Sequence, residues 1–295
     1  MPASPRIPVI PGTPGSPDAS GYSSTLTWEH RRFLQHLFPG EDCLLAAEST
    51  LIFGVDGSRV FAQPLAVVRP STLEQVRELL AWAHAERMPL YPRARATNQT
   101  GACVPDPPGI VVSTLKLNRI LEVNPADFVA VVEPGVITAD LQARAQALGL
   151  FYAPDPASVR SSTIGGNVAT CAGGMRALKY GVTRDWVLGL EAVLPGGDVL
   201  RLGGRTHKNV VGLDLTRLLV GSEGTLAFIT RITLKLLPLP QATASLLAGF
   251  DDLETALAAA RGVFASGLLP AAMEFMAEEV LDCLALAGPV PWPPG

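Results

Sequence analysis

Residues 162–174 read STIGGNVATCAGG and are the most informative stretch of this chain. Two glycine pairs, Gly165-Gly166 and Gly173-Gly174, are interleaved with small and hydroxyl-bearing residues over a longer run than one turn requires. Glycine lets the backbone approach a ligand closely and aim its N–H groups at anionic or carbonyl oxygens. The stretch therefore predicts a nucleotide-binding loop, with tight turns between strands as the alternative.

The commonest nucleotide-binding motifs do not occur in the sequence. Neither G-x-G-x-x-G nor G-x-x-x-x-G-K-[ST] is present, which disfavours an ordinary NAD-dependent dehydrogenase and a P-loop hydrolase. The 23 Lys and Arg residues against 27 Asp and Glu residues give a net charge of −4. This balance provides no general attraction for nucleic acid, so we expect no nucleic-acid partner.

The composition indicates a globular, turn-rich protein. Hydrophobic residues make up 48% and charged ones 17%, and there are 28 Gly and 26 Pro among 295 residues, a length that suggests one large domain or two ordinary ones. No apolar run reaches the roughly 18 residues of a membrane-spanning helix. We expect a chain without a spanning segment, cytoplasmic, with its four widely spaced cysteines reduced.

Apolar patterning predicts alternating strands and helices. A strand at 65–68 leads to a helix that begins near Ser71, where Val76, Leu79, Leu80 and Ala83 form one apolar stripe. This order of elements indicates mixed α and β architecture. Further elements are strands at 90–91, 110–112 and 128–132, a helix from about 138 to 149, a hairpin of 187–194 and 199–202, and a strand pair of 225–229 and 232–237.

The two ends of the chain have a different character. Proline stands at every third position from Pro2 to Pro17, which favours an extended polyproline II arm over residues 1–24, either a solvated tail or a ligand for another protein. Beyond the boundary near Pro240, residues 241–295 are too few to bury a core. There we expect a strand at 245–250, a helix at 253–263, a strand at 272–276 and a helix at 278–286.

Six motifs in a fixed order carry a family resemblance: RPST at 69–72, EPG at 133–135, PDP at 154–156, the 163–174 loop, KYG at 179–181 and GSEGTL at 221–226. With them the chain resembles the FAD-linked oxidases of the vanillyl-alcohol oxidase and p-cresol methylhydroxylase superfamily. Within that superfamily it is most similar to the glycolate oxidase catalytic subunit and FAD-dependent D-lactate dehydrogenases. The likeness extends from about Trp28 to the end of the chain.

The resemblance implies an α+β fold with a two-lobed FAD-binding domain of the p-cresol methylhydroxylase type. That domain is expected at 25–240, with lobes at about 25–115 and 116–240, followed at 241–295 by the start of a truncated α+β cap domain. The residues that the resemblance assigns to FAD are Pro92, Arg93, Ala94, Arg95, Ala96, Thr97, Asn98, Gly101, Pro154, Asp155, Pro156, Ser158, Ser162, Thr163, Ile164, Gly165, Gly166, Asn167, Ala169, Gly173, Gly174, Gly181 and Ile229.

One departure from the family pattern lies in the first cofactor loop. The family form P-R-G-x-G-T here has Ala94 and Ala96 at the two glycine positions. If either position needs a positive φ, an alanine there costs about 1 kcal/mol or more and adds a methyl group beside the pyrophosphate. Arg93 and Arg95 could compensate by pairing with the phosphates, and the alternative for both is solvated loop charge.

The resemblance implies non-covalent FAD, because no histidine occurs in this loop or in the 163–174 loop. His207 could face the flavin edge, although a single histidine is more often structural. The sequence identifies no catalytic residue and no metal site.

The implied activity is oxidation of a small 2-hydroxy acid, of glycolate or D-lactate type, to the 2-oxo acid. No iron–sulfur cysteine motif occurs, so we expect electrons to pass to a partner redox subunit, such as an iron–sulfur subunit, or to a quinone. The protein could then lie peripherally at the inner face of the membrane. Two alternatives remain open: a non-catalytic FAD-binding subunit that needs a partner chain, and a flavoenzyme similar to UDP-N-acetylenolpyruvoylglucosamine reductase.

Overall fold

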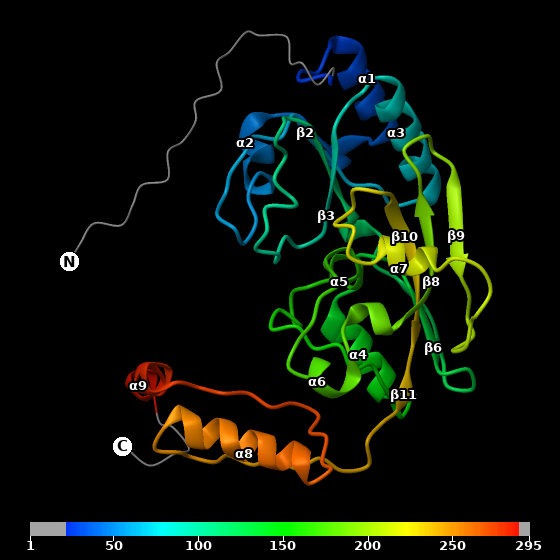
Figure 1. Ribbon diagram of the computed structural model, residues 1–295. Coiled ribbons are helices and arrows are strands. Elements are labelled where there is room, and N and C mark those ends of the chain that lie inside the picture. The colour runs from blue at the N-terminus through cyan, green and yellow to red at the C-terminus, as the bar shows by residue number, and fades with distance from the viewer. Residues whose placement is uncertain (1–21, 289–295) are drawn as a thin grey trace.

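A first β-sheet organises the N-terminal part of the chain. The computed structural model describes residues 22–288 (Figure 1), so the prolines at 2–17 lie outside it. The sheet has the order β1-β2-β4-β3, with β4 parallel to both β2 and β3. Its elements are α1 Trp28–Leu37, β1 Cys43–Leu44, β2 Ala66–Val68, α3 Leu73–Ala85, β3 Leu90–Arg93 and β4 Ile110–Ser113.

Helix α3 forms where the apolar stripe predicted it. Thr72 caps the helix by accepting a hydrogen bond from the Gln75 N–H, and such a cap stabilises a helix by about 1 kcal/mol. The stripe residues are all buried and pack in one cluster with residues of β2, β4 and α1. Val193 and Phe228 of the second sheet join the same cluster, which ties the two sheets together.

The second sheet is antiparallel and has the order β5-β6-β10-β8-β9. Residues of α4 and α5, with Trp186, pack against its buried face in a second core. The predicted hairpin is confirmed, because β8 pairs with β9 across residues 194–198. The elements are β5 Ile120–Asn124, β6 Val129–Val132, α4 Thr138–Gln146, α5 Ile164–Thr170, β8 Val187–Val193, β9 Val199–Gly203 and β10 Phe228–Lys235.

Short elements complete this part of the chain, and β7 pairs with β11 in a two-stranded sheet. The mixed α+β expectation is confirmed. The short elements are the 3-10 helices η1 Gly40–Asp42, η2 Leu51–Phe53, η3 Thr114–Lys116 and η4 Thr183–Asp185, the helices α2 Ala47–Thr50, α6 Ala177–Tyr180 and α7 Leu215–Leu219, and the strands β7 Leu150–Phe151 and β11 Leu237–Pro238.

Two sequence-based assignments were wrong in the central part. The expected strand pair 225–229 and 232–237 is one strand, β10, because Thr230 and Arg231 do not turn the chain. The pairing of β10 with β8 is irregular between Ile229 and Arg231, so the strand continues through Thr230 and Arg231. The Thr230 hydroxyl donates to the Glu191 carbonyl at 3.2 Å. The segment expected as a loop at 163–174 contains helix α5 over its first half.

The C-terminal segment projects from the two-sheet body (Figure 1). Helices α8 Leu253–Ala265 and α9 Glu278–Ala287 form close to the predicted places and bury none of their residues. The strands expected at 245–250 and 272–276 do not form. A strand needs a hydrogen-bonding neighbour, and in the described residues these two extended stretches have none.

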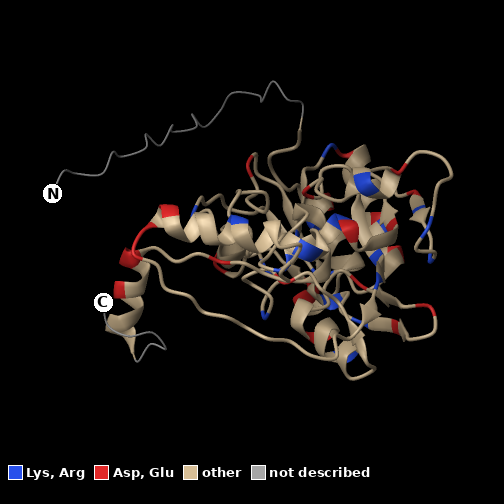
Figure 2. Cartoon of the chain, turned by 60° about the horizontal axis from the view of Figure 1, so that its bottom comes forward, with Lys and Arg blue, Asp and Glu red and all other residues tan. Residues whose placement is uncertain are grey.

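No helix within residues 22–288 is long and apolar enough to cross a membrane. Basic and acidic residues are interspersed over the body of the molecule (Figure 2). The body therefore shows no large region of a single charge in this view.

Candidate cofactor site

A cavity of about 300 Å³ lies where the first sheet meets the second. Three segments form its walls. They are residues 92–103, which are the end of β3 and the loop after it and which we call the cofactor loop, helix α5 with its cap, and residues 223–229, which lead into β10 and include its first two residues. Of the residues assigned from sequence, it is lined by Pro92, Arg93, Ala94, Arg95, Ala96, Thr97, Asn98, Ser158, Thr163, Gly165, Gly166, Asn167, Ala169 and Ile229.

The other assigned residues lie outside the cavity lining, and their contact with a cofactor stays a prediction. A Cβ on Gly174 would overlap the Asp155 carbonyl, and the same aspartate pairs with Arg176 at 3.3 Å. The assigned residues outside the lining are Gly101, Pro154, Asp155, Pro156, Ser162, Ile164, Gly173, Gly174 and Gly181.

Arg93 is a buried cation among the residues that line the cavity. Its side chain is 8% exposed, Nη2 donates to the Ile52 carbonyl at 3.3 Å, and the guanidinium lies over the Phe53 ring. Its Nη1 has no hydrogen-bond partner. Burial lowers the pKa of this guanidinium, but an arginine stays charged at neutral pH. A buried unpaired donor is costly, so this position favours an anionic or carbonyl ligand.

The cofactor loop has the backbone that glycine would favour, although it carries alanine. Ala96 has a φ of 52°, in the left-handed region where a Cβ costs about 1–2 kcal/mol. Ala94 does not have a positive φ, and it lines the cavity. A positive φ, the condition under which an alanine is costly, therefore occurs at Ala96 but not at Ala94.

Asp56 supports the cofactor loop and was missed in the sequence. It is 8% exposed and accepts hydrogen bonds from the Ser58 N–H at 2.9 Å, the Ser58 hydroxyl at 2.6 Å and the Asn98 amide at 2.7 Å. Burial alone would raise the pKa of this carboxyl, but the bonds from Ser58 and Asn98 hold it below its ordinary value. The Asp-Gly-Ser sequence at 56–58 predicts a turn. It does not predict the hydrogen bond between Asp56 and Asn98, because these residues lie far apart in the sequence.

Cys103 also lines the cavity at the end of the cofactor loop. Its Sγ lies 3.3 Å from Asn98 Oδ1. Burial raises the pKa of the thiol to about 11, so the group is neutral at physiological pH. A neutral thiol is a poor nucleophile, and the cysteine acts here as a small lining residue.

Helix α5 presents its first turn to the cavity. The Thr163 hydroxyl accepts from the Gly166 N–H at 3.1 Å and caps the helix. Gly165 packs so closely on Pro134 that a Cβ there would overlap the proline ring. This contact explains why two residues of low helix propensity stand in the first turn of a helix, because tertiary packing overrides propensity.

A buried polar network fixes the far side of α5. Asn167 donates from Nδ2 to the Thr138 hydroxyl at 2.8 Å, and that hydroxyl lies 2.9 Å from the Ser162 hydroxyl. All three side chains are buried. A satisfied network of this kind holds a single orientation, so Asn167 reaches the cavity wall from a rigid position.

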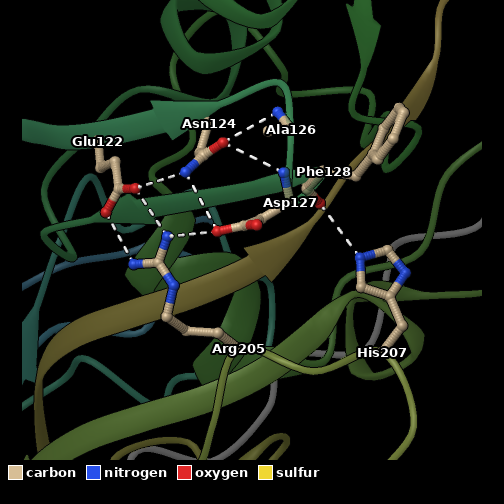
Figure 3. Close-up of polar contacts among 7 residues, drawn as sticks. All are labelled: Glu122, Asn124, Ala126, Asp127, Phe128, Arg205 and His207. Carbon is tan, nitrogen blue, oxygen red and sulfur yellow. Dashed lines mark hydrogen bonds and ion pairs between the residues drawn. The ribbon is translucent and has the colours of Figure 1, made fainter.

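His207 lies away from the cavity. Its Nε2 is 3.3 Å from the Phe128 carbonyl, at the turn between β5 and β6 (Figure 3). Beside it, Arg205 donates two hydrogen bonds of 2.7 Å to the Glu122 carboxylate. These bonds, with one from Asn124, lower the pKa of Glu122 to about 2. This cluster anchors the segment after β9 to the second sheet, and the structural interpretation of His207 is the one supported.

The described residues contain no group of three or more His, Cys, Asp or Glu side chains placed to hold a metal ion. The cavity lining offers arginine, hydroxyl, amide and backbone groups instead. Such donors suit oxygen atoms of an organic ligand.

Two family models match this chain. The family described as FAD binding domain matches residues 64–203, and the family described as FAD linked oxidases, C-terminal domain, matches residues 239–294. Glycolate oxidase subunit GlcD of Bacillus subtilis (strain 168) is 41% identical over 232 residues, which are 78% of this chain and 49% of that protein.

Two further relatives have related names. D-lactate dehydrogenase of Anaerostipes hadrus is 39% identical over 75% of this chain and 46% of its own length. D-2-hydroxyglutarate dehydrogenase of Stutzerimonas stutzeri (strain A1501) is 39% identical over 86% of this chain and 55% of its own length. The chain spans about half the length of the curated relatives it matches.

Solved structures show the same fold. Alkyldihydroxyacetonephosphate synthase superimposes with a TM-score of 0.72 at 25% identity, over 84% of this chain and 47% of that one. p-Cresol methylhydroxylase with bound substrate superimposes with a TM-score of 0.64 at 21% identity, over 72% of this chain and 43% of that one. The two-sheet body is therefore a fold seen in proteins of diverse sequence.

Proposed function

This chain belongs to the FAD-linked oxidases, and from that premise we propose that it binds FAD non-covalently in the cavity beside Arg93 and serves the oxidation of a small 2-hydroxy acid. The observation that carries the proposal is a buried arginine that lines the cavity and whose Nη1 has no hydrogen-bond partner. FAD carries a diphosphate, the kind of anion that arginine binds best.

The residues present fit this cofactor. The lining brings together one buried and one exposed arginine, hydroxyl groups of Thr97, Ser158 and Thr163, and glycines of α5 where the backbone itself reaches the wall. Polar oxygens of a nucleotide find donors there, and the apolar lining from Phe228 and Ile229 suits a flat aromatic ring. Among the described residues no histidine lines the cavity, and the Cys103 thiol is protonated, which supports non-covalent binding.

The substrate class follows from the names of the relatives. Glycolate, D-lactate and D-2-hydroxyglutarate are all 2-hydroxy acids. Oxidation to the 2-oxo acid removes two electrons and two protons from the carbon and oxygen of the hydroxyl-bearing centre. When bound, FAD supplies an acceptor for those two electrons. We propose that the substrate is one of the smaller acids of this class, of the glycolate or D-lactate type.

The electrons then need a second acceptor. We propose a partner redox subunit or a quinone, and a cytoplasmic location, free or peripheral at the inner face of the membrane. The proposal is supported by the relative from Bacillus subtilis, which is itself named a subunit. A second candidate, a non-catalytic FAD-binding subunit completed by another chain, is favoured by α8 and α9, which bury none of their residues.

The test is a visible spectrum of the purified chain before and after addition of FAD, followed by anaerobic addition of glycolate or D-lactate. We expect flavin absorbance to remain with the protein after gel filtration and to bleach with one of the two acids. Absence of bound flavin overturns the proposal. Bound flavin that stays oxidised with both acids supports the second candidate.

A further inference from the structure

Helix α1 carries a second hollow, away from the cofactor cavity. This shallow hollow of about 450 Å³, which we call the α1 hollow, is lined by Trp28, Glu29, Arg32, Phe33 and His36. Trp28 is 66% exposed, and the Arg32 guanidinium lies over its ring at 5.4 Å. The helix lies at the end of the molecule, beside α3 (Figure 1). A large exposed aromatic ring beside polar groups is typical of a binding surface.

The core holds the floor of the α1 hollow in place. Phe33 stacks on Trp82 of α3, with ring centroids 4.7 Å apart and 22° between the ring planes. The helix itself begins with a capping box between Thr27 and His30, and its Leu34 is fully buried. A surface that is already ordered loses little side-chain freedom when it binds a ligand.

Aromatic rings and hydrogen-bond donors in this arrangement suit a polyproline II segment. Such a segment makes no internal backbone hydrogen bonds, so its carbonyls accept from a partner, and its prolines pack in aromatic-lined grooves. The Arg32 guanidinium and the Trp28 indole are donors. From Trp28 to His36 the helix rises about 12 Å at 1.5 Å per residue, and a P-x-x-P unit spans about 9 Å at 3.1 Å per residue. The hollow therefore accommodates one such unit and its flanks.

The chain carries a segment of this kind before α1. Proline stands at every third position from Pro2 to Pro17, and a helix with three residues per turn places such prolines on one side. Among residues 2–17 only Arg6 is charged, with a sign opposite to that of Glu29 in the hollow. The stretch 5–11, PRIPVIP, thus combines two P-x-x-P units with the one charge of the arm.

The distance along the chain favours the arm of the same molecule as the occupant. Residues 12–21, which include three glycines, join this stretch to Tyr22, the first residue that the structure describes. Ten residues reach roughly 17 Å on average, comparable to the length of α1, about 15 Å. A short tether gives an effective concentration of the order of 1 mM. A second copy at micromolar concentration competes poorly with that.

We propose that residues 5–11 dock as a polyproline II segment in the α1 hollow of the same chain. The proline rings lie against Trp28 and Phe33, and Arg6 lies beside Glu29. Helix α1 is then an interaction surface for a proline-rich ligand, and its occupant is the arm of this chain. This docking does not involve FAD and is independent of the proposed function.

The test follows the indole ¹⁵N–¹H resonance of Trp28 in the full chain, assigned by its loss in Trp28→Phe. Two variants each replace three prolines of the arm: Pro5→Ser with Pro8→Ser and Pro11→Ser, and, as the matched control, Pro2→Ser with Pro14→Ser and Pro17→Ser. We expect the first variant to move the Trp28 resonance without moving that of Trp186, which is buried in the core. The control should move neither. A peptide of residues 4–12 at millimolar concentration should return the first variant to the wild-type position, and the same peptide with serine for proline should not.

Proteolysis gives a second readout, because trypsin cleaves after Arg6 and releases residues 1–6, which mass spectrometry follows. Cleavage of a shielded bond depends on the population of the open form. We expect Trp28→Ala to speed this cleavage about fivefold. The control is Phe275→Ala, at a 60% exposed aromatic residue of the C-terminal segment, and it should leave the rate unchanged.

Three results overturn the inference. The first is a Trp28 resonance that is the same in wild type and in the variant at 5, 8 and 11. The second is an equal shift in both proline variants, or equal cleavage rates in wild type and Trp28→Ala, because the contact is then not specific. The third is a Trp28 resonance that moves with protein concentration, because the occupant is then the arm of another copy.

Discussion

Asn98 donates its side-chain amide to the Asp56 carboxylate at 2.7 Å, across a sequence separation of 42 residues. The same carboxylate accepts from the backbone and hydroxyl of Ser58. The Gly57 N–H also donates to the Asn98 carbonyl at 2.9 Å. Asp56 thus holds the cofactor loop against the 54–61 segment from behind the cavity.

Replacing Asp56 should loosen that loop. We expect Asp56→Ala to lower the free energy of unfolding by about 2 kcal/mol, because it leaves hydrogen-bond donors of Ser58 and Asn98 without their buried acceptor. FAD affinity should fall as well, since the loop must then be ordered on binding. Urea unfolding of the apoprotein and FAD titration measure the two effects. Asp251→Ala, at an exposed residue of the C-terminal segment, should change neither, and an equal effect in both variants would contradict the role given to Asp56.

Ala96 stores strain that a glycine would release. Its left-handed φ of 52° costs about 1–2 kcal/mol for a residue with a Cβ, while glycine adds about 0.4–1 kcal/mol of unfolded-chain entropy. The difference predicts that Ala96→Gly stabilises the apoprotein by about 0.5–1 kcal/mol. The control is Ala94→Gly, because Ala94 has no positive φ. This variant should lower the stability of the apoprotein by about 0.4–1 kcal/mol, the entropy that glycine adds to the unfolded chain. Thermal unfolding checks the sign, and destabilisation by both variants would count against strain at Ala96.

Local patterns predicted the elements whose causes are local. Helix α3 follows from the Thr72 cap and its apolar stripe, and the β8–β9 hairpin follows from two apolar runs around a Pro-Gly-Gly turn. The cofactor loop and the Gly165-Gly166 pair were placed at one cavity by the family motifs. These features are written in short stretches of sequence.

The rest depends on contacts between distant residues. Asp56 has no motif, and only the fold brings it to Asn98. Helix α5 has two glycines in its first turn because Pro134 packs on Gly165, a contact that helix propensity does not predict. The stretches at 245–250 and 272–276 have strand-like sequences but no neighbouring strand in the described part of the chain. In the first two cases the deciding partner is far away along the chain.

The ion pair of Arg205 and Glu122 should make stability depend on acidity (Figure 3). Arg205 and Asn124 lower the pKa of Glu122 from 4.5 to about 2 in the folded state. The contribution is therefore complete above pH 4.5 and is lost as the pH falls towards 2. In urea unfolding from about pH 6 to about pH 2.5, the gap between wild type and Glu122→Gln should narrow. The control is Glu48→Gln, which removes an exposed carboxylate without side-chain contacts and whose stability difference from wild type should not change with pH. If the stability difference between wild type and Glu122→Gln is equally independent of pH, the prediction is wrong.

The two glycines of α5 should separate folding from cofactor binding. At Gly165 a new Cβ overlaps Pro134, so Gly165→Ala must displace α5 or the proline and should cost about 1–3 kcal/mol of stability. At Gly166 the nearest atoms lie 3.4 Å and 3.6 Å away, on Thr163 and Ala94, so the same substitution is accommodated and gains helix propensity of up to about 1 kcal/mol. Its methyl, however, would lie in van der Waals contact with the Ala94 methyl at the cavity wall. We expect Gly166→Ala to keep or raise the unfolding free energy while weakening FAD binding severalfold, and Gly165→Ala to lower both. Urea unfolding and FAD titration of each variant decide the matter: if Gly166→Ala binds FAD as tightly as wild type, the diphosphate or flavin does not lie between α5 and the cofactor loop.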